Sequence, residues 1–196
     1  MINKIKILIA TFLLLPFWIL VRKQKNFELI SGDISEWLRR YHKPQLVTFK
    51  SFVWLMVYQL AFRNVLYYRM KGFSIFASWL YKKQNEPIIT HSGPIGKGLF
   101  FCHGFSTMLG VKSIGENCWI NQQVTIGFTK DGVPTIGNNV TIYAGAIILG
   151  DITIGDNAVI GAGAVVLKDV PANSMAFGNP ARILKLEEIE PVLMDV

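Results

Sequence analysis

The sequence predicts a mainly β protein, a parallel β-helix preceded by an α-helical region. Aliphatic residues recur at every sixth position through most of the stretch from Ile95 to Val170, and glycine often follows them. A second small or aliphatic residue stands four places after each. A helix requires a period of 3.6 and an ordinary sheet an alternation, so a period of six fits a short strand and a corner, repeated around a coil.

The repeat assigns each position a role. The residues predicted to point inward are Met108, Ile114, Ile120, Ile126, Ile136, Ile142, Ile148, Ile154, Ile160 and Val166. Cys118 and the alanines at the fourth places suit a crowded interior, and the glycines would form corners where a Cβ is strained. The repeat slips by one residue between Phe101 and Met108, and four extra residues within 128–135 predict a protruding loop. The alternative, a β-sandwich with chance spacing, does not explain six consecutive hexads.

The charge is divided unevenly along the chain. Residues 1–85 hold 14 Lys and Arg against 3 acids, whereas residues 86–196 hold 6 against 10. The basic residues lie among long apolar runs, which fits an anionic membrane surface better than nucleic acid. Two cysteines, Cys102 and Cys118, make no disulfide framework.

Residues 7–21 carry no charge. As a helix they reach only about 22 Å, short of the roughly 30 Å core of a bilayer. Basic residues flank the stretch on both sides, and no cleavage site of small residues follows. We expect an uncleaved membrane anchor or an in-plane helix; a buried core helix and a cleaved signal peptide are the alternatives.

The segment up to residue 85 reads as further helices. A short amphipathic helix is expected over 34–41, capped by Ser31 or Asp33, and a longer one over 46–70. A second short helix is expected over 73–81. Tryptophan and tyrosine lie beside lysine and arginine in this segment, a composition typical of residues at a membrane–water interface. The alternative is a helical cap that packs on the β-helix or on a neighbouring subunit.

Several segments resemble a known family. They are Ile95–Gly104, Val124–Gly127, Ala162–Pro171 and Gly178–Arg182. On these the chain resembles the hexapeptide-repeat acyltransferases, which are left-handed β-helices with three hexads per coil, and within them the serine acetyltransferase branch and its relatives in surface-polysaccharide synthesis. At three hexads per coil and with allowance for five inserted residues, the 76 residues from Ile95 to Val170 give about four coils. The resemblance also implies a homotrimer and acetyl-CoA as co-substrate, and no metal is expected. Expected segments are an anchor or interfacial helix (1–25), a helical region (26–85), the β-helix (86–186) and an acidic tail (187–196).

The resemblance also assigns site residues. His103 falls on the family's catalytic histidine, a general base that deprotonates the acceptor for direct attack on the thioester. Gly127, Ala144 and Ala162 would line the coenzyme A groove, and Lys168 and Arg182 would contact its phosphates. His42 is expected at a helix end and His91 on a loop, without chemical roles. Three histidines around zinc, as in a β-helical carbonic anhydrase, are not available.

Two departures bear on the acceptor. The family's orienting aspartate falls on Ile88, so Glu86, His91, Ser106 or a backbone carbonyl would have to orient His103. The Arg-His-Pro segment that serves the serine acceptor is Gly132-Val133-Pro134 here, without the guanidinium that pairs with a carboxylate. The sequence therefore favours an O-acetyltransferase acting on a sugar hydroxyl in surface-polysaccharide synthesis, at the cytoplasmic face of the bacterial inner membrane. A serine O-acetyltransferase of cysteine synthesis and a catalytically inactive β-helix are the alternative functions, and the cytoplasm is the alternative location.

Overall fold

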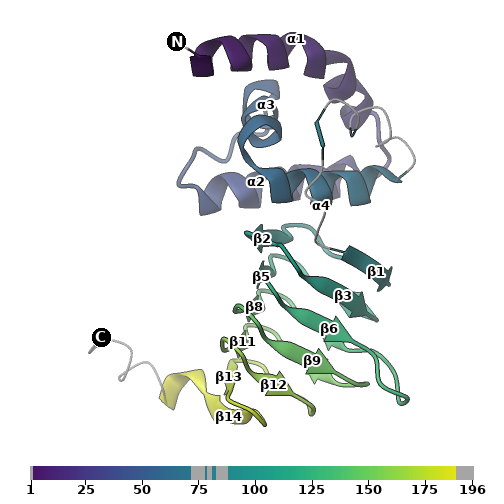
Figure 1. The fold of residues 1–196 in the computed structure, drawn as a ribbon, viewed down its shortest axis with the longest axis vertical. Helices are drawn as coiled ribbons and strands as arrows, with labels where there is room; N and C mark the ends of the chain where they lie inside the picture. Colours follow the sequence, from purple (N-terminus) through teal and green to yellow (C-terminus); the bar gives the residue numbers. More distant parts are fainter. Residues whose placement is uncertain (1, 72–77, 79–80, 83–87, 189–196) are drawn as a thin grey trace. The chain divides into compact units, whose positions relative to one another are not determined.

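The computed structural model describes residues 2–71, 78, 81–82 and 88–188 (Figure 1). The chain divides into two compact units, residues 1–86 and residues 87–196. The first is α-helical and the second is a β-helix, which confirms the mainly β class with a helical N-terminal region. The helix predicted over 73–81 and most of the tail predicted over 187–196 lie outside the described residues.

The helical unit contains α1 (Ile2–Arg22), α2 (Phe27–Arg40), α3 (Phe49–Tyr58) and α4 (Leu60–Met70). The cap predicted at Ser31 or Asp33 is wrong, because α2 begins earlier and contains both residues. Asp33 is instead buried against α4, where Arg69 Nε donates to Asp33 Oδ2 over 2.9 Å and Nη2 donates to Oδ1 over 3.3 Å. The carboxylate thus joins two helices and caps neither.

The single helix predicted over 46–70 is divided at Gln59, whose backbone is extended. The buried guanidinium of Arg63, in α4, donates to the carbonyls of Met56 and Val57 in the last turn of α3. The final carbonyls of a helix have no partner within it, so a cation that donates to them stabilises the end. Burial lowers the pKa of Arg63. Thr48 and Ser51 form a capping box at the other end of α3.

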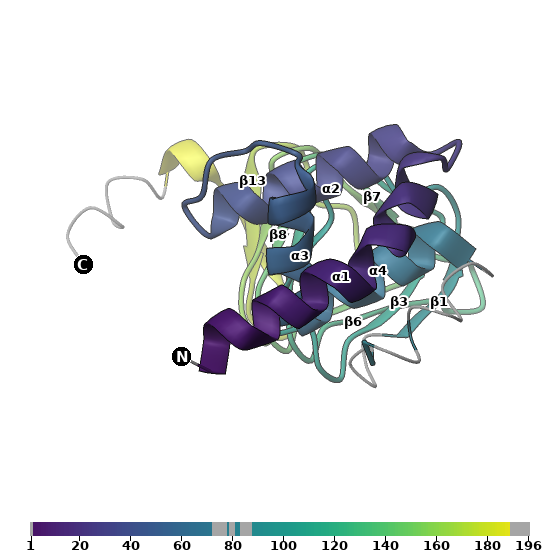
Figure 2. The ribbon, with the colours of Figure 1, turned by 90° about the horizontal axis from the view of Figure 1, so that it is seen from above.

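Helix α1 packs on α3 through one of its faces (Figure 2). The rings of Trp18 and Phe52 lie 4.8 Å apart between centroids, and Phe17 also contacts Phe52. Aromatic burial of this kind supplies much of the stability of a small helical unit. Within the described residues, no helix has the combination of length and hydropathy needed to cross a bilayer.

The second unit is a parallel β-helix of about four turns with three sheets, as the period of six predicts (Figure 1). One sheet contains β1 (Ile88–Ser92), β3 (Met108–Val111), β6 (Thr125–Gly127), β9 (Ile147–Leu149) and β12 (Val165–Val166). A second contains β4 (Ser113–Ile114), β7 (Thr135–Ile136) and β10 (Thr153–Ile154). The third contains β2 (Phe100–Cys102), β5 (Trp119–Asn121), β8 (Thr141–Ile142), β11 (Val159–Ile160), β13 (Ser174–Phe177) and β14 (Arg182–Lys185).

The predicted inward residues are buried, with one correction. Ile120, Ile142 and Ile160, for example, lie one above another and are fully buried. Met108, however, is 48% exposed, and Leu109 is the buried residue, paired with Ile126. The spacing from Phe101 to the next inward residue is therefore eight, not seven, and the two extra residues form a bulge described below.

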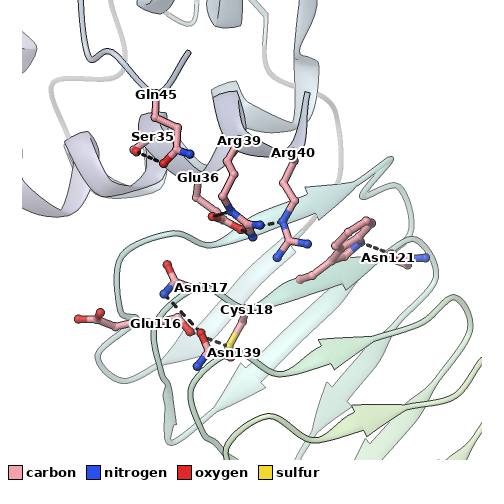
Figure 3. A network of polar contacts seen from close by, with 11 residues as sticks. Ser35, Glu36, Arg39, Arg40, Gln45, Glu116, Asn117, Cys118, Asn121 and Asn139 are labelled. Carbon is pink, nitrogen blue, oxygen red and sulfur yellow. Dashed lines mark hydrogen bonds and ion pairs between the residues drawn. The ribbon is translucent and has the colours of Figure 1, made fainter. Parts of the chain in front are cut away.

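The glycines have a different role from the one predicted. A Cβ on Gly115 would lie 2.6 Å from the carbonyl oxygen of Gly137 in the next coil, so glycine is required for close stacking. The left-handed backbone conformation at this corner belongs to asparagines (Asn117, Asn139, Asn157 and Asn173), a residue type that tolerates it. Their side-chain amides form a ladder between coils, of which the pair Asn117 and Asn139 appears in Figure 3.

The predicted loop leaves the β-helix between β6 and β7. Thr129 and Gly132 exchange backbone hydrogen bonds of 3.0 and 3.3 Å across it. After β13 the chain reverses into β14, which pairs antiparallel with it, so these residues fold back along the last coil. A short 3-10 helix, η2 (Leu186–Glu188), follows.

The two thiols should differ in reactivity. Cys118 is fully buried inside the coil, as predicted, and burial raises its pKa to about 11. Cys102 is half-buried, and burial also raises its pKa. Because the thiolate is the reactive form, we expect an aromatic disulfide reagent at pH 8 to label Cys102 slowly and Cys118 only after unfolding. Counting labelled thiols with and without denaturant tests this; two rapid labels on the native protein would contradict it.

Candidate functional site

His103 lies in an outward bulge between two coils. Cys102 pairs with Asn121 in the next coil, and the carbonyl of Phe105 accepts a hydrogen bond from Gln123 N–H at 2.9 Å. Met108 pairs with Thr125, so residues 103–107 stand against residues 122–124 of the next coil, an excess of two. His103 and Gly104 open this bulge, and both have left-handed backbones, with φ of 67° and 68°. The His103 side chain is exposed. Such a conformation in a non-glycine residue is uncommon and often accompanies a functional site.

Three residues below the bulge form a column on one corner of the β-helix. The N–H of Gly145 donates to the carbonyl of Gln122 over 3.1 Å, and the N–H of Gly163 donates to the carbonyl of Ala144 over 2.9 Å. The strand register therefore places Gln122, Ala144 and Ala162 one above another, with Gln122 directly below the bulge. A Cβ on Gly163 would meet nothing within 4 Å, and one on Gly145 would meet only the backbone of Gly163 at 3.9 Å, so no side chain covers the backbone at these two positions of the corner.

The other predicted cofactor residues are divided between two corners. Arg182 is the first residue of β14 and pairs with Phe177, the last residue of β13. Because β13 lies beside β11, the strand that precedes Ala162, Arg182 lies at the C-terminal end of the same corner. Gly127 ends β6, and Lys168 follows β12 in the same sheet, which places both at the next corner, beside the loop 128–134. The structure thus joins His103, Ala144, Ala162 and Arg182 along one edge, and Gly127 and Lys168 along another.

Gln122 was not predicted from the sequence as a site residue. Its side-chain oxygen Oε1 is buried and has no hydrogen-bond partner among the described residues. A buried oxygen without a hydrogen bond costs about 1–3 kcal/mol of free energy, so a group that donates a hydrogen bond to Gln122 Oε1 would remove this cost. The sequence signal was weak, because Gln122 occupies a corner position where any polar residue is acceptable.

The other two histidines lie on other elements of the chain. His42 follows the end of α2, as predicted, and is exposed. His91 lies in strand β1, so the loop predicted for it is wrong. Glu86, one suggested partner of His103, is outside the described residues. Among those described, no three His, Cys, Asp or Glu side chains cluster as metal ligands would.

Comparison with known proteins identifies the repeat. Residues 134–168 match the family model for the bacterial transferase hexapeptide (six repeats). The chain is 38% identical over 152 residues to a probable serine acetyltransferase 2 of Oryza sativa subsp. japonica, a match that covers 70% of this chain and 43% of that protein. It is 40% identical over 129 residues to a serine acetyltransferase of Synechococcus elongatus, covering 55% and 52%.

A solved structure supports the same relationship. The crystal structure of serine acetyltransferase from Brucella abortus strain S19 superimposes with a TM-score of 0.58 at 27% identity, covering 85% of this chain and 71% of that one. The chain spans about half the length of the curated relatives it matches. By its repeats, its fold and these relatives, this chain is similar to the hexapeptide-repeat transferases and, among them, to serine acetyltransferases.

Proposed function

We propose that the chain is an acetyl-CoA-dependent O-acetyltransferase with His103 as its general base. One observation carries the proposal. His103 and Gly104 form a left-handed bulge between β2 and β3, and this bulge exposes an imidazole above a corner of small residues. That all the curated relatives compared above are named serine acetyltransferases supports the same activity. We take the coil to be left-handed, as the resemblance implies.

The proposed reaction is a direct transfer. His103, in its neutral form, removes the proton of the acceptor hydroxyl as the oxygen attacks the thioester carbonyl of acetyl-CoA. The C–S bond then breaks, the acetyl group stays on the acceptor oxygen, and the coenzyme A thiolate takes the proton back from the imidazolium of His103 and leaves as a thiol. Ala144 and Ala162 would admit the pantetheine arm along their corner, and Arg182 and Lys168 are the cations proposed for its phosphates. Gly127 would keep the second corner open.

The acceptor we favour is serine, because the relatives are named for it, and this replaces the sugar hydroxyl preferred from the sequence. The sugar remains a second candidate on one specific observation. Gly132 and Val133 stand where the resemblance places arginine and histidine in a serine acetyltransferase, and a Cβ added at Gly132 would lie only 3.0 Å from the Cβ of Asp151. A serine carboxylate would need another cation, whereas a sugar hydroxyl needs none.

The rate of thiol release from acetyl-CoA decides between the acceptors. Purified full-length protein would be assayed with L-serine and, separately, with a panel of neutral sugars at equal concentration. We expect release that depends on L-serine. Release with sugars alone would move the assignment to the second candidate, and no release with any hydroxyl acceptor, from protein with intact circular dichroism, would overturn the proposed activity.

Gln122 is the partner we propose for orienting His103. Gln122→Glu would place a carboxylate in the coil directly below the bulge of His103, and a nearby negative charge raises the pKa of a histidine. Because the base acts in its neutral form, the acidic limb of the kcat/KM profile should move to higher pH, by about one unit. The profile of Asn139→Asp, which adds the same charge at another corner, should match the wild type. An unmoved limb in Gln122→Glu would contradict this role.

We further propose a homotrimer, in which the open corner of one chain faces a neighbouring chain. Sedimentation equilibrium measures this directly: a mass near three times 22.1 kDa is expected, and a monomer at assay concentrations would contradict it.

A further inference from the structure

Helix α1 is apolar on more than one face, and only one of them is covered. Positions spaced three and four apart are buried against the rest of the helical unit: Ala10, Leu14, Phe17, Trp18 and Val21. The rest of the helix surface is exposed and also apolar, and its residues are Leu8, Ile9, Phe12, Leu13, Leu15, Ile19 and Leu20. Phe12 is 73% exposed and Leu8 is 59% exposed. A helix that is apolar all round normally has both faces covered, and an exposed patch of this extent marks an interaction surface.

The helix α3 continues this surface beside α1. An apolar groove of about 230 Å³ lies between the two helices, lined by Ile7, Thr11, Phe49, Lys50, Val53 and Trp54. At its edge, Trp54 packs against Tyr41 and Tyr58, with ring centroids 5.5 and 6.0 Å apart. Lys43 Nζ lies 4.4 Å from the centre of the Trp54 ring. Tryptophan, tyrosine and lysine together are the residues that proteins place at the headgroup level of a bilayer.

The charges around the surface are almost entirely positive. Lys6 lies at one end of the exposed face and Arg22, Lys23 and Lys25 at the other, and all four are exposed. Of the three acids before residue 86, Asp33 is paired with Arg69 and Glu36 accepts hydrogen bonds from Arg39 and Arg40 (Figure 3). Glu28 is the remaining one. The potential at this face is therefore complementary to an anionic surface.

We propose that α1 and the adjoining groove bind the surface of an anionic lipid bilayer, with α1 lying in the plane of the interface. The exposed apolar face enters the boundary between headgroups and acyl chains, and the basic residues at both ends contact lipid phosphates. A second copy of the chain fits less well, because two α1 helices packed face to face would bring basic ends together in either direction. The proposed lipid-binding surface contains none of the residues proposed for acetyl transfer, so either proposal can fail without the other.

Flotation of full-length protein with lipid vesicles tests the proposal. Vesicles of phosphatidylcholine containing phosphatidylglycerol should bind the protein, and vesicles of phosphatidylcholine alone should bind it more weakly. Phe12→Glu should lower the binding constant by about tenfold or more, since it replaces a deeply inserted ring with a charge. Changing Arg22, Lys23 and Lys25 together to glutamine should lower it by about a hundredfold.

The matched control is Leu184→Glu, which adds the same charge at an exposed leucine of the β-helical unit and should leave binding unchanged. Circular dichroism confirms that each variant is folded. Equal binding to charged and neutral vesicles, or binding that Phe12→Glu does not reduce, would overturn the proposal. Self-association that Phe12→Glu abolishes, without vesicle binding, would overturn it too and assign the face to a second copy.

Discussion

Replacing His103 with alanine should lower kcat/KM for acetyl transfer by about 10²- to 10⁴-fold, the usual contribution of a positioned general base. The side chain is exposed in a bulge and has no part in the buried core of the β-helix, so the fold should survive. Steady-state thiol release at saturating acetyl-CoA measures the effect, and the KM for acetyl-CoA should change little.

The matched control is His42→Ala, which removes an exposed imidazole that also has a left-handed backbone, in the helical unit. Its kcat/KM should equal that of the wild type. A loss of less than about threefold in His103→Ala, with the control unchanged, would remove His103 from the chemistry and leave the bulge without a catalytic role.

Replacing Asp33 with alanine should destabilise the helical unit by about 3–5 kcal/mol, because it leaves the guanidinium of Arg69 buried without its carboxylate. The side chains of Arg69 and Asp33 are only 4% and 2% exposed, so water cannot substitute. Four of the five tryptophans lie before residue 86, and urea unfolding followed by tryptophan fluorescence therefore reports on this unit.

Two further variants distinguish loss of the Asp33–Arg69 ion pair from the general effect of a substitution on stability. Asp131→Ala, at an exposed loop position, should change stability by less than about 0.5 kcal/mol. The double substitution Asp33→Leu and Arg69→Met should recover most of the loss, because an apolar pair of similar volume carries no unpaired charge. A loss below about 1 kcal/mol in Asp33→Ala would show that the pair contributes little.

The period of six predicted the β-helix and its core, because each inward residue is fixed by a local rule of size and hydropathy. Ile142 and Ala146 could be assigned from the sequence for this reason. Leu109 could not, since Met108 beside it is also apolar and only the two-residue bulge at His103 decides which one points inward. The role of Gly115 was also missed, because it depends on contact with a coil 22 residues away in sequence.

The candidate site was only partly predictable. His103 could be named because the segment around it resembles a family in which a histidine acts. Its relation to Gln122 depends on strand register across the bulge, which spacing alone leaves open. In the helical unit, Asp33 looked like a cap because it precedes an apolar run, and the distant Arg69 that pairs with it was invisible in the local pattern.

Mass spectrometry of the reaction products tests the central claim most directly. After incubation with acetyl-CoA and L-serine, the account predicts an O-acetylated product, its absence with His103→Ala, and a protein mass unchanged at every time point. Acetyl-CoA consumed without an acetylated acceptor, or an acetyl group found on Cys102 before product forms, would contradict direct transfer by His103.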